Sequence, residues 1–305
     1  MSTSTPEPTV VVTGANGFVG AAVCRALVER GARVRAVVRR PGTAPDLDGV
    51  EEYVGEFHDP QLAEQAVNDA DAVISTVHPL GGDPEQQRQI AVEGTPVLAR
   101  AARDAGVPVF VHVSTAAVYD RSPSVGDVEE SSDLVPDDID NVYAVTKRDA
   151  DRALAEIGGI TRVLLRPPAI LGPGPSSIWN TLRPQDVGAD EGARTTNPDK
   201  SFAWVHVDDL AALAADLVTG RVATSDDPES GPVEGGCTPV NVAAETATQR
   251  DYIGTVSDAL GVEPVWTDEE SWTGRMLAER ARRWGWKPQV TLDEALRELR
   301  DGLRG

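Results

Sequence analysis

The stretch TVVVTGANGFVG, residues 9–20, decides the fold. Its first residues are apolar or β-branched, which predicts a short buried strand. Gly14, Gly17 and Gly20 follow at the spacing G-x-x-G-x-x-G, and they open a helical stretch that ends at Gly31. A turn of this kind lets the backbone approach a pyrophosphate, which the N–H groups and dipole of the helix N-terminus then stabilise. The stretch therefore predicts a dinucleotide site at the first strand–helix junction.

The residues of this turn and the end of the next strand indicate which dinucleotide is bound. The expected contacts from the turn are Gly14, Asn16, Gly17, Phe18 and Val19. Sites that prefer NAD usually carry an acidic residue at the end of the second strand, but here Arg39 and Arg40 occupy that end. A guanidinium there can pair with a 2′-phosphate, which favours NADP(H) over NAD(H). The alternative is that both arginines are simply solvated.

Short apolar segments alternate with longer amphipathic segments from residue 9 to residue 168. This rhythm predicts an α/β fold of the Rossmann type, a doubly wound parallel sheet, with a smaller C-terminal substrate lobe. Residues 1–8 are expected to form a disordered tail. The dinucleotide-binding domain is assigned to residues 9–168 plus about 202–220, and the substrate lobe to about 169–201 and 221–305.

Composition narrows the range of partners. The chain has 305 residues and a net charge of −21, which would repel nucleic acid and anionic membrane surfaces, so the expected partner is a small molecule. The start lacks the basic and apolar regions of a signal peptide, and a cytoplasmic location is expected. Two cysteines and four scattered histidines form no disulfide framework and no metal-ligand spacing, so no metal is predicted.

The segment DNVYAVTKRDADRAL, residues 140–154, places Tyr143 four positions before Lys147 in a chain with only four tyrosines and three lysines. Residues four apart share a helix face, so the phenol and the ammonium can face one cleft. A cation about 4 Å from a phenol would lower its pKa by about three units, toward the range where general acid–base catalysis is efficient. A solvated helix face is the alternative interpretation.

In combination these motifs resemble the short-chain dehydrogenase/reductase superfamily, and within it the extended NAD-dependent epimerase/dehydratase family. The carrying segments appear in the family's order: TGANGFVG, VSTAAVY, YAVTK, LLRPPAILGPG and WVHVDDLA. The resemblance covers nearly the whole chain. It implies an NAD(P)-dependent oxidoreductase, and it also implies a homodimer, because members commonly pair through a four-helix bundle that would include the Tyr143 helix.

The resemblance also implies roles for individual residues. Thr115 matches the catalytic Ser/Thr that hydrogen-bonds the reacting oxygen, with Ser114 as its neighbour and substitute. Tyr143 would donate or accept the proton, and Lys147 would orient the cofactor ribose and lower the pKa of the tyrosine. Ser114, Lys147 and Pro167 are also expected to contact the cofactor.

Departures from the family pattern bear on the substrate. Phe202 stands where nucleotide-sugar members usually have a diphosphate-binding arginine, and Ala116 and Ala117 replace the acidic pair of the dehydratases. The main hypothesis is therefore hydride transfer to or from a carbonyl or secondary alcohol of a small metabolite. The alternatives are a nucleotide-sugar epimerase or ketoreductase with bound NAD(P), and a non-catalytic dinucleotide-binding sensor.

Overall fold

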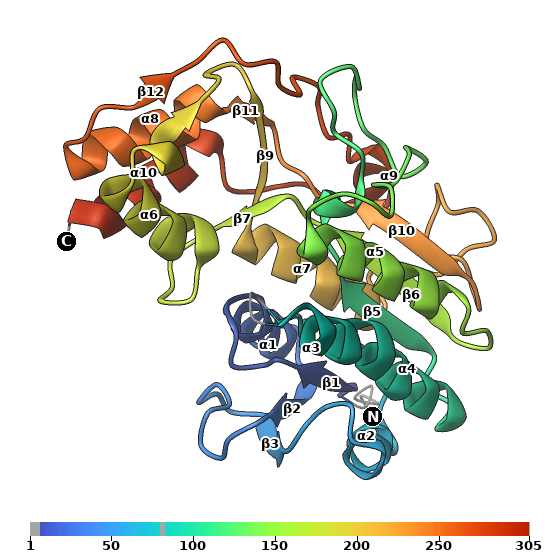
Figure 1. Ribbon diagram of the computed structural model, residues 1–305. Helices are drawn as coiled ribbons and strands as arrows, with labels where there is room; N and C mark the ends of the chain where they lie inside the picture. Colours follow the sequence, from blue (N-terminus) through green and yellow to red (C-terminus); the bar gives the residue numbers. More distant parts are fainter. Residues whose placement is uncertain (1–6, 80–82, 305) are drawn as a thin grey trace.

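A seven-stranded parallel sheet forms the larger part of the molecule (Figure 1). The computed structural model describes residues 7–79 and 83–304; residues 1–6 of the expected tail lie outside this range. The strand order is β10-β6-β5-β4-β1-β2-β3, and every neighbouring pair is parallel. The strands are β1 (Thr9–Thr13), β2 (Arg33–Val38), β3 (Val50–Val54), β4 (Ala72–Ser75), β5 (Val109–Val113), β6 (Thr161–Arg166) and β10 (Cys237–Asn241). The order reverses between β1 and β4, which is where such sheets bind ligands.

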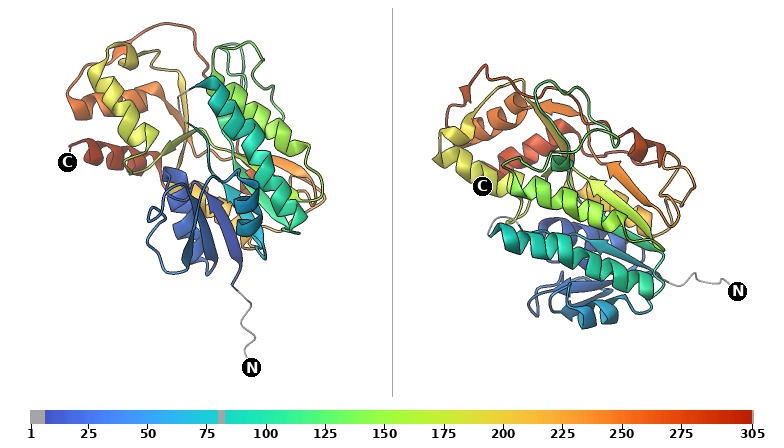
Figure 2. Two further views of the ribbon diagram at one scale, coloured as in Figure 1. Left: turned by 60° about the horizontal axis from the view of Figure 1, so that its bottom comes forward. Right: turned by 45° about the vertical axis from the view of Figure 1, so that its right-hand side comes forward.

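Helices cover both faces of the sheet, so the predicted Rossmann-type α/β fold is confirmed. One face carries α1 (Phe18–Glu29) and α7 (Val207–Val218), which pack against each other. The opposite face carries α2 (Pro60–Val67), α4 (Thr95–Asp104) and α5 (Val142–Ala155). Figure 2 shows α4 and α5 side by side along the sheet. Before α4 the chain forms α3 (Pro84–Arg88) and a π-helical segment (Gln89–Gly94), which lead directly into α4.

A smaller lobe packs beside the carboxyl ends of the strands (Figure 1). Its sheet has the order β11-β9-β7, and a separate pair joins β12 to β8. The strands are β7 (Ala169–Leu171), β8 (Thr195–Thr196), β9 (Ser201–His206), β11 (Thr246–Thr248) and β12 (Val265–Trp266). The helices are α6 (Arg183–Ala189), α8 (Gln249–Leu260) and α10 (Leu292–Arg304), and short helical segments lie at Ile178–Leu182 and Gly192–Arg194. A further short turn, Ala116–Val118, follows β5 and packs in the core of the larger unit. A second apolar core holds this lobe together, centred on Trp204 and Tyr252.

Residues 237–241 belong to the main sheet, although the sequence pattern placed all of 221–305 in the substrate lobe. β10 pairs with β6 and forms an edge of the seven-stranded sheet. The pattern could not reveal this, because a strand's partner is set by long-range packing rather than by its own residues. We therefore propose that β10 (Cys237–Asn241) belongs to the dinucleotide-binding domain and not to the substrate lobe.

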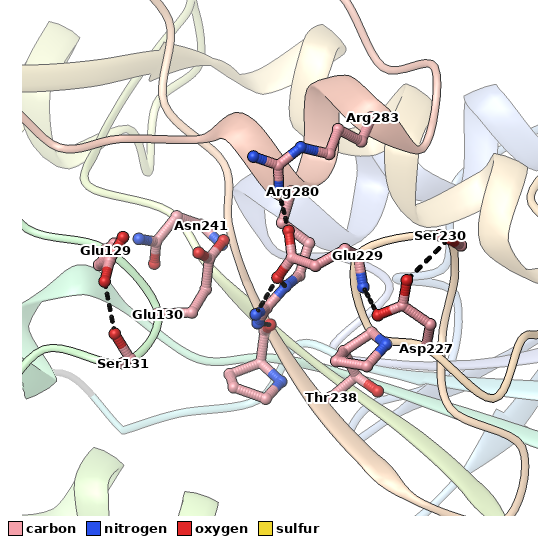
Figure 3. A network of polar contacts seen from close by, with 12 residues as sticks. Glu129, Glu130, Ser131, Asp227, Glu229, Ser230, Thr238, Asn241, Arg280 and Arg283 are labelled. Atoms are coloured by element: carbon pink, nitrogen blue, oxygen red, sulfur yellow. Dashed lines mark hydrogen bonds and ion pairs between the residues drawn. The ribbon is translucent and has the colours of Figure 1, made fainter.

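The short helix α9 (Glu279–Arg283) ties the loop before β10 to the larger unit. Figure 3 shows Arg280 and Arg283 converging on the carboxylate of Glu229 in that loop. Arg280 Nη1 also donates to the carbonyl of Pro239 at 2.7 Å, and Trp284 Nε1 donates to the carbonyl of Pro228 at 3.0 Å. Two arginines sharing one carboxylate hold the loop more firmly than a single exposed ion pair would.

Candidate active site

A cavity of about 580 Å³ runs along the carboxyl ends of the sheet strands. It begins at the glycine turn after β1, passes Arg39 at the end of β2, and reaches Ser114, Tyr143 and Lys147. Its volume lies in the range of cavities that hold cofactors and small ligands. One continuous space therefore joins the predicted dinucleotide site to the predicted catalytic pair.

The glycine turn has the close packing that a phosphate-binding turn requires. Gly14 has a φ of 68°, and its carbonyl accepts a hydrogen bond from the Gly17 N–H at 2.9 Å. A Cβ on Gly20 would lie 2.1 Å from the Gly14 carbonyl oxygen, which is a backbone clash. Asn16, Gly17, Phe18 and Val19 line the cavity from this turn. The N-terminus of α1 therefore presents bare N–H groups to the cavity, which fits a pyrophosphate.

The two arginines after β2 differ in position. Both are exposed, but Arg39 lines the cavity and Arg40 is not among the described residues that line it. Glu52 on β3 does not compete for Arg39, because its carboxylate accepts backbone N–H groups of Gly42, Thr43 and Ala44. These hydrogen bonds lower the pKa of Glu52 and order the loop after β2. The geometry thus separates one candidate phosphate ligand, Arg39, from a solvated arginine.

Tyr143 lies at the inner end of the cavity, on the first turn of α5. Asn141 caps this helix by accepting the Ala144 N–H at 3.1 Å, which fixes where the helix begins. The Thr115 side chain lies near the Tyr143 hydroxyl and acts to lower its pKa, and the Tyr143 ring contacts the His78 ring edge to face at 4.9 Å between centroids. Tyr143 and Thr115 therefore lie near each other, and their catalytic roles stay a prediction.

Lys147 sits one turn deeper, where it is 2% exposed. Its Nζ donates to the carbonyl of Val113 at 2.7 Å. Burial lowers the pKa of Lys147 to about 8, and the nearby carboxylate of Asp151 opposes this. The pKa of Tyr143 is raised by burial, with the Thr115 hydrogen bond opposing it. This direction is opposite to the one expected from the Tyr–Lys spacing, because desolvation of the buried phenol is the largest effect on its pKa.

A buried network of polar side chains lies one helical turn beyond Lys147. Arg166 Nε donates to Asp151 Oδ2 at 3.0 Å, and Arg166 Nη1 donates to Tyr119 Oη at 2.9 Å. Tyr119 in turn donates to Asn241 Oδ1 at 2.8 Å. Asp151 is four residues after Lys147 on the same helix face. Burial raises the pKa of Asp151, and the charge of Arg166 is the largest effect opposing this.

Lys147→Met is expected to stabilise the protein at neutral pH while removing a predicted functional group. A folded-state pKa of about 8, against 10.5 for an ordinary lysine, corresponds to about 3 kcal/mol of destabilisation, and the lost hydrogen bond to Val113 offsets about 1 kcal/mol. Below pH 8 the lysine is charged in both the folded and the unfolded protein, so burial of the charge lowers the stability by the full amount. Above pH 8 the folded protein loses this proton, and the cost falls to zero once pH passes 10.5, where the unfolded chain loses it too. Urea denaturation should show a net gain of about 2 kcal/mol at pH 7 that disappears by about pH 10.

Lys287→Met is the matched control, because Lys287 is exposed. Its stability should change by less than about 0.5 kcal/mol at either pH. A loss of stability in Lys147→Met at pH 7, or a gain that does not shrink with rising pH, would show that burial of the Lys147 ammonium does not destabilise the fold.

Pro167, which was expected to contact the cofactor, is not among the described cavity residues: its carbonyl accepts the Ala116 N–H at 2.8 Å, and Pro168 lines the cavity instead. Arg183 donates to the carbonyl of Ala193, and Arg194 donates to the carbonyl of Glu263. Trp179 lines the cavity, whereas Trp204 and Trp272 are buried in separate apolar cores.

His78 and Asp151 are the functional candidates that the sequence pattern did not single out. His78 follows β4, and side chains that follow parallel strands meet at the same edge of the sheet. Asp151 continues the i, i+4 series that begins at Tyr143. Both signals were present in the sequence, but each needs the strand order or helix register to be interpreted.

Comparison with known proteins is consistent with this geometry. The model of the NAD dependent epimerase/dehydratase family matches residues 10–228. A 2-alkyl-3-oxoalkanoate reductase from Stenotrophomonas maltophilia (strain K279a) is 35% identical over 177 residues, covering 55% of this chain and 53% of the relative. Cinnamoyl-CoA reductase 1 from Petunia hybrida is 31% identical over 221 residues, covering 66% of each. The matches thus span about half to two thirds of these relatives.

Solved structures show the same fold over nearly the full length. The Bordetella bronchiseptica enzyme WbmH in complex with NAD+ has a TM-score of 0.77 at 20% identity, covering 98% of this chain and 99% of the other. The UDP-glucose 4-epimerase of Thermus thermophilus, in complex with NAD, has a TM-score of 0.74 at 22% identity, covering 97% and 99%. Among the described residues, no helix is long and apolar enough to cross a membrane. The chain belongs to the NAD dependent epimerase/dehydratase family, whose members are NAD(P)-dependent enzymes.

Proposed function

We propose that this protein is an NADP(H)-preferring reductase that acts on a carbonyl group of a small, partly apolar metabolite. The observation that carries this proposal is the single cavity that joins the glycine turn and Arg39 to Tyr143 and Lys147. Trp179, Ile178 and Pro168 give that cavity apolar lining. A bound nicotinamide dinucleotide would supply the hydride.

The side chains at the inner end are suited to handling the accompanying proton. Tyr143 holds its phenolic proton, since burial raises its pKa, and it would donate that proton to the substrate oxygen as negative charge develops there. The Thr115 hydroxyl, which lies near that of Tyr143, would orient the phenol and stabilise the same oxygen. Lys147, held in place by the Val113 carbonyl, would provide positive charge next to the phenolate that remains.

A nucleotide-sugar substrate is less well supported. Phe202, at the position of the usual diphosphate-binding arginine, is 3% exposed and stacks on Tyr252 with 4.4 Å between ring centroids. It therefore belongs to the core of the smaller lobe. Without an arginine there, one charge-assisted contact to the diphosphate is missing, and such a contact contributes up to about 3 kcal/mol.

The test of this proposal is a screen for oxidation of NADPH and NADH with aryl and alkyl ketones, aldehydes and UDP-sugars. We expect NADPH oxidation with at least one ketone or aldehyde and no conversion of the UDP-sugars. Conversion of a UDP-sugar with no net change in the cofactor would instead support the epimerase alternative. Cofactor binding with no turnover on any compound would support the non-catalytic sensor.

Arg39→Ala is expected to weaken NADPH binding about 10- to 100-fold and to leave NADH binding unchanged. The reason is that a charge-assisted hydrogen bond to a phosphate contributes about 1.5–3 kcal/mol, and NADH has no 2′-phosphate. Fluorescence titration with both cofactors measures the effect. Arg40→Ala is the control, because Arg40 is exposed and outside the cavity lining. Equal losses for the two cofactors, or equal losses in both variants, would remove the 2′-phosphate role from Arg39.

The homodimer and the cytoplasmic location remain predictions from the sequence. Pairing through the Tyr143 helix would bury the outer surfaces of α4 and α5, which lie side by side (Figure 2). Light scattering of the purified protein would measure its mass, and a mass of 32.3 kDa would contradict the dimer.

A further inference from the structure

The carboxylate of Glu52 on β3 holds the loop that follows β2. Its Oε1 accepts the N–H of Gly42 at 2.8 Å, and its Oε2 accepts the N–H groups of Thr43 and Ala44, each at 3.0 Å. Both carboxylate oxygens are therefore engaged by the main chain of three consecutive residues. Because hydrogen bonds to an ionised acceptor are stronger than neutral ones, this one side chain fixes the path of the loop.

The same loop is tied to the glycine turn. The Thr43 hydroxyl donates to the carbonyl of Arg40 at 2.7 Å, and Asn16 Nδ2 donates to Thr43 Oγ1 at 3.3 Å. Asn16 and Arg39 both line the cavity. They follow β1 and β2, which are neighbouring parallel strands, so both lie at the same edge of the sheet. The hydrogen bonds from Glu52 therefore act, through Thr43, on the wall that Asn16 and Arg39 form.

This wall lies where the adenosine end of a dinucleotide is expected. A pyrophosphate on the glycine turn directs the adenosine ribose toward the end of the second strand, and a 2′-phosphate on that ribose would lie next to Arg39. A loop that is already held in place does not have to be ordered when the ligand arrives, which strengthens the binding of a ligand that contacts it. NADH has no 2′-phosphate, so it gains less from the ordered loop.

We propose that Glu52 is a positioning residue for the 2′-phosphate: by holding residues 42–44 it keeps Arg39, Thr43 and Asn16 in place, and the preference for NADP(H) depends on it. This inference rests on the proposed NADP(H) preference and adds a residue that is not among those described as lining the cavity. The charge of Glu52 acts in the opposite sense, because a carboxylate repels a phosphate. That repulsion is screened by water and salt, whereas the hydrogen bonds act directly on the loop, so positioning dominates.

The test compares Glu52→Ala with Glu51→Ala. Glu51 is the exposed neighbour of Glu52 on β3, so its substitution removes the same charge from the same strand. Dissociation constants for NADPH and NADH are measured by fluorescence titration. We expect Glu52→Ala to lower the preference for NADPH over NADH at least about fivefold, with NADH binding changed less than about threefold. Glu51→Ala should keep the preference within about twofold of the wild type.

Hydrogen exchange of the loop amides checks the physical cause. The N–H groups of residues 42–44 should exchange at least about tenfold faster in Glu52→Ala and at the wild-type rate in Glu51→Ala. If Glu52→Ala does not fold, as judged by circular dichroism, Glu52→Gln is measured by the same criteria. Because the glutamine keeps one acceptor oxygen, its preference for NADPH should fall by a smaller factor, at least about twofold.

Three results in Glu52→Ala would overturn the inference. Equal losses for the two cofactors would leave Glu52 with a structural role only. A preference for NADPH that is unchanged or raised would show that repulsion balances or outweighs positioning, and unchanged exchange of the loop amides would show that Glu52 does not hold the loop. Failure of the proposed cofactor preference is distinguishable, because the wild type itself would then bind NADPH no more tightly than NADH.

Discussion

Tyr143→Phe should lower kcat for carbonyl reduction by about 10²- to 10⁴-fold, the usual contribution of a positioned general acid. The substitution removes one oxygen and its proton and keeps the ring, so the contact with His78 and the shape of the cavity are preserved. KM and cofactor affinity should therefore change by less than about threefold. Steady-state kinetics with NADPH and the best carbonyl substrate separate the two parameters.

Tyr53→Phe is the control for this prediction, because Tyr53 lies on β3 and outside the described cavity lining. Its kcat should stay within about twofold of the wild type. If Tyr143→Phe retains wild-type kcat, another group protonates the product, and the arrangement of Thr115, Tyr143 and Lys147 has no catalytic role.

Arg166→Met should be the most destabilising of the substitutions considered, by about 3–5 kcal/mol. Arg166 is 5% exposed and pairs with Asp151, which is 2% exposed. Removing the guanidinium leaves a buried carboxylate without its main counter-charge and leaves the Tyr119 hydroxyl without one of its partners. Urea denaturation at pH 7 measures the loss.

Two further variants make this prediction specific. Arg275→Met removes a guanidinium from an exposed pair with Asp127 and should cost less than about 1 kcal/mol. The double variant Asp151→Asn/Arg166→Met should recover at least about 1 kcal/mol relative to Arg166→Met, because no buried charge is then left unpaired. Equal losses in Arg166→Met and Arg275→Met would show that the buried network does not stabilise the fold.

Local sequence patterns predicted the larger part of the fold because, in that part, the local preference of each segment agrees with its place in the sheet. The apolar strand at residues 9–13, the turn glycines and the amphipathic helices each have one stable way to bury their apolar faces in a parallel sheet. The cavity residues from Asn16 to Val19 followed from the same turn. β10 was misplaced, because five residues with no helix immediately after them do not reveal which strand they join.

The electrostatics of the site could not be predicted from spacing. The Tyr143–Lys147 interval identified two groups on one helix face, but the pKa of each depends on how much water surrounds it. Burial raises the pKa of the phenol and lowers that of the ammonium. Two contacts near the catalytic pair also depend on the fold. His78, which follows β4, meets the Tyr143 ring, and Arg166 on β6 pairs with Asp151, only because the fold brings these segments together.

The most direct test of the reductase account is the fate of the hydride and the proton in a single experiment. The protein is incubated with NADPH carrying deuterium at the transferable position and with the ketones that it binds, and the products are analysed by mass spectrometry. We predict an alcohol with one deuterium on the carbinol carbon, formed at least about 100-fold more slowly by Tyr143→Phe. An alcohol without deuterium, or label transfer at the wild-type rate in Tyr143→Phe, would contradict the account.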